Sequence, residues 1–175
     1  VLMKIPKLSL VEVQNALVEK FHCDTIAARN AATLANGNWI LAQRFVNDYE
    51  DEKLYFQYFQ KWMRYCFRFS ASELIDFIAN DIKSLGREKQ KEFLAYGLNF
   101  FHNALMMNNG LRDNVMLPDD EKAFLNNFAP FISNNNIDMI SELFEESINQ
   151  IERNGNASII FMDNSFKIFN YFKMK

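Results

Sequence analysis

The stretch EKLYFQYFQKWMRYCFRF, residues 52–69, decides the fold of this chain. Its apolar side chains recur every three to four residues, which is the period of an α-helix. They form two stripes, the first with Tyr55, Phe59, Trp62, Cys66 and Phe69 and the second with Phe56, Met63 and Phe67. A helix that is apolar on two sides is buried on both. The stretch therefore predicts a central helix whose second stripe is available for an interface.

The other apolar patterns are helical as well. Ser9 and Glu12 form a capping box before residues 11–21, and Ser70 and Glu73 form another before residues 74–85. Gly97 predicts close helix packing within the pattern of residues 87–109. Further helices are expected over residues 25–36, 39–46, 136–154 and 157–174, with another from Pro118 onward. Since no segment alternates like a strand, we predict an all-α protein.

The acidic segment NDYEDEK, residues 47–53, separates two parts of different composition. Before it, Gly37 is placed to end one helix and Asn38 to cap the next, which predicts three short helices. After it, aromatic residues become frequent, and the chain contains 18 phenylalanines. A chain of 175 residues is long enough for two packed domains. We predict a three-helix domain over residues 1–47 and a helical bundle over residues 48–175.

A basic stripe follows the same central helix. Lys61, Arg64 and Arg68 are spaced so that they lie on one face. Such a stripe indicates a solvated or ion-paired face, an interface, or a contact with phosphate groups. One alternative function of the chain is therefore a helical DNA-binding module that uses these three residues. The net charge of −3 disfavours that alternative because it gives no overall attraction to nucleic acid.

The sequence lacks the patterns of several other functions. It contains neither a phosphate-binding glycine loop nor a dinucleotide-binding glycine motif. Glu19 and His22 form a single E-x-x-H pair, whereas a di-iron site in a helical bundle needs two such pairs. Cys23 lies beside His22, but the sequence specifies no third group that would orient the pair for a thiol nucleophile. We therefore expect no catalytic residue, no cofactor and no metal. The longest apolar runs are too short to cross a membrane, and the start carries no signal peptide, so we expect a cytoplasmic protein.

Two parts of the chain resemble a known family. The segment IPKLSLVEVQNALVEKFHCDTIAARNAATLANGNWILAQRF, residues 5–45, is similar to the three-helix lid of clamp-loader subunits of the AAA+ class. The segments GREKQKEFLAYGLNFFHNALMMNNG, EKAFLNNFAPFI and IERNGNASIIFMDNSFKIFNYF resemble the C-terminal collar domain of bacterial DNA polymerase III delta prime subunits. The chain starts at Val1, and the resemblance implies an ATPase-like domain upstream of it.

The resemblance implies a role in assembly within an ATP-driven complex. Collar domains pack into a ring with the gamma or tau and delta subunits, and the complex loads the sliding clamp on primed DNA. Ile40 stands where ATP-sensing members carry an arginine, which favours a delta prime subunit over the alternative, a gamma or tau subunit. A ring needs two different lateral faces on each subunit. The residues expected at these faces are Phe56, Met63, Phe67, Phe100 and Phe169.

Overall fold

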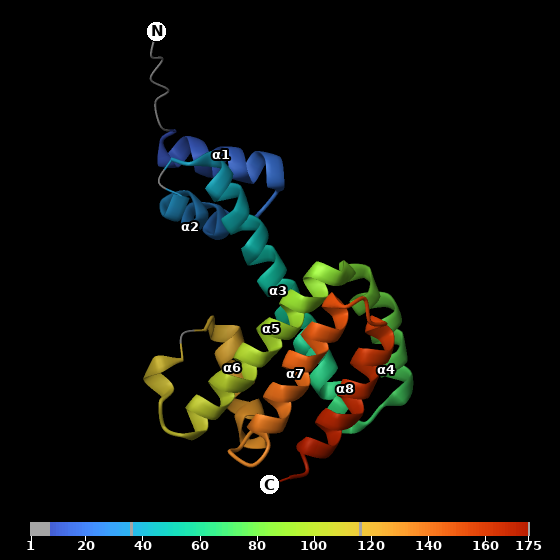
Figure 1. The fold of residues 1–175 in the computed structure, drawn as a ribbon. Coiled ribbons are helices and arrows are strands. Elements are labelled where there is room, and N and C mark those ends of the chain that lie inside the picture. Colours follow the sequence, from blue (N-terminus) through green and yellow to red (C-terminus); the bar gives the residue numbers. More distant parts are fainter. Residues whose placement is uncertain (1–7, 36, 116, 175) are drawn as a thin grey trace. The chain divides into compact units, whose positions relative to one another are not determined.

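The computed structural model describes residues 8–35, 37–115 and 117–174, and all of its regular elements are helical (Figure 1). The α-helices are α1 (Leu10–Phe21), α2 (Thr25–Ala35), α3 (Trp39–Arg68), α4 (Ala71–Phe77), α5 (Lys83–Asn108), α6 (Asp119–Phe128), α7 (Ile137–Glu152) and α8 (Ala157–Tyr171). A π-helical turn, η1 (Ile78–Ile82), joins α4 to α5, and η2 (Arg112–Asn114) and η3 (Ala129–Phe131) are short 3-10 turns. The expected all-α fold is confirmed, because no described residue lies in a strand.

The chain forms two compact units, and the first one ends at Leu54. In this unit α1 packs against α2, and the Phe21 ring lies 6.4 Å from the ring of Trp39 at the start of α3. The predicted capping box forms, because the Glu12 amide donates to Ser9 Oγ and the Ser9 amide donates to the Glu12 carboxylate. Alanines make up most of the buried core of this unit. The core residues are Val13, Leu17, Cys23, Ala28, Ala31, Ala32, Ala35, Ala42 and Val46.

The second unit begins at Tyr55 and is a bundle with an aromatic core. Figure 1 shows α7 and α8 beside α5, and each of these three helices contacts the other two. Most of both stripes is buried: Trp62 on the first contacts Phe93, Phe144 and Phe161, and Phe56 on the second contacts Phe100 and Phe124. The last residue of each stripe, Phe67 and Phe69, remains exposed. Gly97 of α5 lets two rings approach, since a Cβ there would lie 3.0 Å from Phe144 and 3.3 Å from Phe59.

Two local expectations are corrected. The acidic residues 47–53 continue the helix, so α3 runs unbroken from Trp39 to Arg68 instead of forming two helices. This segment contains neither glycine nor proline, and its charged side chains are compatible with a solvated helix. The Ser70 side chain makes no capping hydrogen bond, although α4 begins at the expected residue, Ala71. None of the described helices is both long and apolar enough to span a bilayer.

Candidate binding pocket on the aromatic bundle

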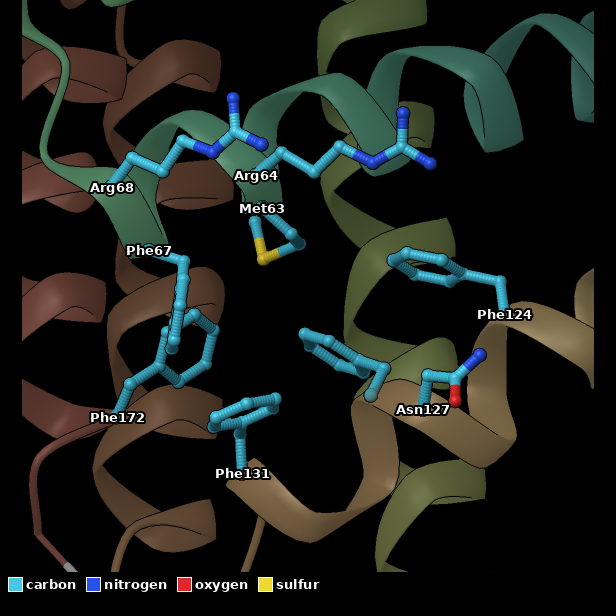
Figure 2. Close-up of a pocket in the computed structure, with 9 residues that line it drawn as sticks. Met63, Arg64, Phe67, Arg68, Phe124, Asn127, Phe131 and Phe172 are labelled. Atoms are coloured by element: carbon cyan, nitrogen blue, oxygen red, sulfur yellow. The ribbon is translucent and has the colours of Figure 1, made fainter.

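An apolar pocket of about 280 Å³ opens on the second unit (Figure 2). The C-terminal half of α3 forms one wall, and α6, η3 and the residue after α8 form the others. The residues that line the pocket are Met63, Arg64, Phe67, Arg68, Phe124, Asn127, Phe128, Phe131 and Phe172. An apolar cavity with a few convergent polar groups is the usual form of a binding site.

Aromatic rings from three separate parts of the chain surround the pocket. The Phe67 ring lies 5.0 Å from Phe131 in an edge-on arrangement, and the Phe131 ring lies 6.0 Å from Phe172. Phe124 stacks on Phe128 at 5.5 Å. Phe67 remains 54% exposed despite its ring contact, so this large apolar side chain is available to a partner. Burying an exposed aromatic ring is a strong contribution to association.

A buried asparagine holds two walls of the pocket together. Asn136 is fully buried, and its Nδ2 donates to the backbone oxygen of Phe131 at 2.9 Å and to that of Tyr171 at 3.1 Å. Its Oδ1 accepts from the Ser133 amide at 2.9 Å. These bonds fix η3 beside the end of α8, and they thereby position Phe131 and Phe172. Because buried hydrogen-bonded groups are costly to unpair, the pocket is largely pre-formed.

Two arginines form the basic rim of the pocket. Arg64 and Arg68 lie one turn apart on α3, and Figure 2 shows both side chains along the same edge, above Met63 and Phe67. Both are exposed, and neither forms an ion pair with any acidic residue in the described part of the chain. The residues that line the pocket include no acid. The rim therefore attracts a carboxylate or another anion.

The structure brings some of the predicted site residues together and separates others. Met63, Phe67, Arg64 and Arg68 all line this pocket, so part of the predicted interface and part of the basic stripe form one site. Lys61 lies outside it, where its Nζ is 3.5 Å from Asp81 and 5.7 Å from the centre of the Tyr58 ring.

Three of the predicted interface residues belong to the core. Phe56, Met63 and Phe100 are only 6%, 2% and 1% exposed. The rings of Phe100 on α5 and Phe124 on α6 pack against Phe56. The three predicted residues expose almost no area to a partner, so their assignment to an interface is corrected. Phe169 is half-buried elsewhere on the bundle, where its ring lies 4.5 Å from Phe69 and 3.7 Å from Lys173 Nζ.

The first unit carries the remaining predicted positions. Ile40 is 71% exposed on α3 and has no charge to offer a phosphate group. Glu19 and His22 are exposed, and no group of three or more metal-binding side chains gathers anywhere in the described residues. Cys23 is buried, and loss of hydration raises the pKa of its thiol. A raised pKa disfavours the reactive thiolate.

Sequence reasoning missed the far walls of the pocket. Phe124, Phe128, Phe131 and Phe172 lie far from α3 in the sequence, and only the packing of α6 and α8 brings them to it. Asn136 was expected only as the start of a helix, and its polar type gives no signal of burial. Comparisons of this chain with protein-family models, with curated proteins and with solved structures found no match.

Proposed function

We propose that this chain is the lid and collar part of a clamp-loader subunit of the delta prime type, and that it acts by assembly rather than by catalysis. In this proposal the bundle binds the collars of the gamma or tau and delta subunits. The complete ATP-driven complex then loads the sliding clamp on primed DNA during replication. The resemblance of residues 5–45, 86–110, 121–132 and 151–172 to that family is the starting point.

The observation that carries an assembly role is the pocket rimmed by Arg64 and Arg68. Its walls are apolar, its rim is basic, and Phe67 projects beside it with more than half of its surface exposed. Interfaces combine such aromatic and arginine residues at their centre. The pocket accepts an apolar side chain of a partner, and the arginines pair with acidic residues on either side of that anchor.

The first unit supports the same role. Three of its aliphatic residues, Ile26, Leu34 and Ile40, are 67%, 67% and 71% exposed. In this proposal another domain covers these exposed side chains. In a clamp-loader subunit the lid contacts the ATPase-like domain, and the exposed isoleucine at position 40 suits a subunit that does not sense ATP itself.

The proposal is tested by size-exclusion chromatography with light scattering. The chain is measured alone and mixed with collar domains of the gamma or tau and delta subunits of the same organism. We expect a defined hetero-complex that survives moderate salt. Persistent monomers in every mixture would contradict the assembly role.

A pair of matched variants locates the contact. Replacing both rim residues, Arg64→Gln with Arg68→Gln, should weaken the complex on the order of tenfold because charge-assisted contacts are lost. The control Lys61→Gln removes an exposed cation from the same helix outside the pocket and should leave binding unchanged. The DNA-binding alternative instead predicts strongly salt-dependent binding of duplex DNA that all three substitutions weaken.

A further inference from the structure

The part of α3 that belongs to the first unit carries an exposed aromatic residue within an acidic segment. Residues 47–53 contain four acids and one lysine. Tyr49 is 41% exposed, and Asp48 and Glu52 are exposed as well. Neither Asp48 nor Glu52 forms an ion pair within the described residues. This segment therefore presents an aromatic ring together with two carboxylates that have no cation as partner.

The arrangement around Tyr49 is specific. Asp48 directly precedes Tyr49, and Glu52 follows it by three residues, so the two acids lie one helical turn apart. Among the large apolar side chains that are exposed in the described part of the chain, only Tyr49 has an acid at both of these positions. An exposed ring with two carboxylates beside it is the complement of an apolar pocket with cations on its rim.

The two acids are unfavourably placed for each other. Loss of hydration raises the pKa of the Glu52 carboxyl group, and the charge of Asp48 raises it further. A cation close to both carboxylates would offset this repulsion, because an opposite charge favours the ionised form. The acidic segment therefore gains from contact with a basic surface.

The pocket rimmed by Arg64 and Arg68 has the complementary features. Its walls are apolar, Phe67 at its edge is 54% exposed, and no acid lines it. Figure 2 shows the two arginine side chains along one edge of the pocket. The two arginines lie one turn apart on their helix, and so do the two acids of the segment. Two arginine–carboxylate pairs can therefore form at matching spacing on either side of an aromatic contact.

The segment and the pocket that complement each other must come from different molecules. Residues 48–52 and 64–68 belong to the same unbroken helix, α3, and a helix cannot fold back on itself. No residue of the acidic segment lines the pocket, and no acid in the described chain pairs with Arg64 or Arg68. A second copy of the chain supplies a segment with the required chemistry.

We propose that the pocket binds the acidic segment of a second copy of this chain. The Tyr49 ring of one copy packs against Phe67 of the next, and the two acids pair with the two rim arginines. The contact joins two different surfaces, so each copy keeps a free pocket or a free segment for a further copy. This inference rests on the assembly role proposed for the pocket, and it names the occupant that binds when no other subunit is present.

The test is sedimentation velocity of the chain alone at increasing concentration. We expect the average mass to rise above that of a monomer, and high salt to reverse the rise because it screens the charge pairs. A monomer at every concentration would overturn the proposal. If that monomer still formed a complex with the collar domains of other subunits, the second copy would be the wrong occupant while the assembly role would stand.

Two double variants test the contact from its two sides. The pocket variant is Arg64→Gln with Arg68→Gln, and the segment variant is Asp48→Asn with Glu52→Gln. Each should weaken self-association on the order of tenfold, because charge-assisted bonds are lost. Mixed in equal amounts, the two variants should form a dimer that grows no further, since each pair retains one intact segment and one intact pocket. A mixture no tighter than either variant alone would contradict the contact.

Two further variants separate a defined contact from an effect of net charge. Tyr49→Ser removes the aromatic ring and should also weaken self-association, with circular dichroism as the check on folding. The control Glu142→Gln with Glu146→Gln removes two exposed acids one turn apart on α7, outside the pocket lining, and should leave self-association unchanged. Equal weakening by this control would overturn the proposal, because net charge alone would then explain the association.

Discussion

The two units of this chain are both all-helical, but they pack their cores in different ways. Alanines make up most of the core of the first unit, whereas phenylalanines and Trp62 dominate the core of the second. An alanine lets helices approach closely but buries little apolar surface, while each aromatic ring buries about 150–250 Å². We infer that the second unit is the more stable one, and that the first unit opens first and depends more on partners.

The largest expected effect is in the aromatic core. Phe59 is fully buried, and its ring lies 4.9 Å from Phe100 and 5.4 Å from Phe101. Phe59→Ala should lower the free energy of unfolding of the second unit by about 3–5 kcal/mol, because it leaves a large cavity. Urea unfolding followed by Trp62 fluorescence in a Trp39→Phe background measures this loss. The control Phe166→Ala, at a 46% exposed position, should cost far less.

A smaller effect is expected in the alanine-rich core. Leu17 is fully buried between short helices. Leu17→Ala should destabilise the first unit by about 2–4 kcal/mol and leave unfolding of the second unchanged. Trp39 fluorescence in a Trp62→Phe background follows the first unit, with Leu34→Ala as the exposed control. An equal loss of stability in both units would show that they unfold together. It would contradict the inference that the first unit opens before the second.

Gly97 tests how tightly the aromatic core is packed. A methyl group there meets Phe144 and Phe59, which are both fully buried and held by other rings. Gly97→Ala should therefore destabilise the second unit by about 1 kcal/mol, even though alanine is the better helix former. The measurement is the midpoint of thermal unfolding. A rise in this midpoint would mean that the rings move aside easily.

The smallest effect concerns Glu52, near the end of the first unit. Partial loss of hydration raises the pKa of its carboxyl group, and the nearby charge of Asp48 raises it further. The contribution of Glu52 to the stability of the folded state is therefore fully present below its ordinary pKa. This contribution is lost as the pH rises through the raised pKa of the folded state. Glu52→Gln should stabilise the chain by about 0.2–0.5 kcal/mol at neutral pH.

A pH series checks this assignment. The stabilisation by Glu52→Gln should vanish in acid, where Glu52 is protonated in both the folded and unfolded states. Glu50→Gln, at an exposed position on the same helix, serves as the control. A benefit that persisted unchanged in acid would rule out the charge of Glu52 as the cause.

Local patterns predicted much of the fold. The Ser9–Glu12 capping box and the close packing at Gly97 follow from residue type and spacing, and the structure confirms both. The unbroken α3 was missed because an acidic surface segment looks the same in a helix and in a linker. Ser70 has the residue type of a cap, but the structure shows no capping bond.

The candidate site was predicted only in part. Spacing along one helix placed Arg64, Arg68 and Phe67 on accessible faces, and they do line the pocket. Periodicity cannot tell which stripe the rest of the bundle covers, and so Phe56 and Phe100 were assigned to a surface although they lie in the core. The part played by Asn136 depends on its bond to the backbone oxygen of Tyr171, which is 35 residues away in the sequence, and no local pattern reveals that bond.

Thiol labelling in urea tests most directly whether the two units differ in stability, because each unit contains one buried cysteine. Cys23 lies in the alanine-rich core and Cys66 in the aromatic core, where burial raises the pKa of its thiol to about 12. Both react only after opening, so the labelling rates of the single-cysteine variants Cys66→Ser and Cys23→Ser report the opening of each unit. We predict that Cys23 is labelled at clearly lower urea concentrations than Cys66. Coincident labelling of the two thiols would contradict this account.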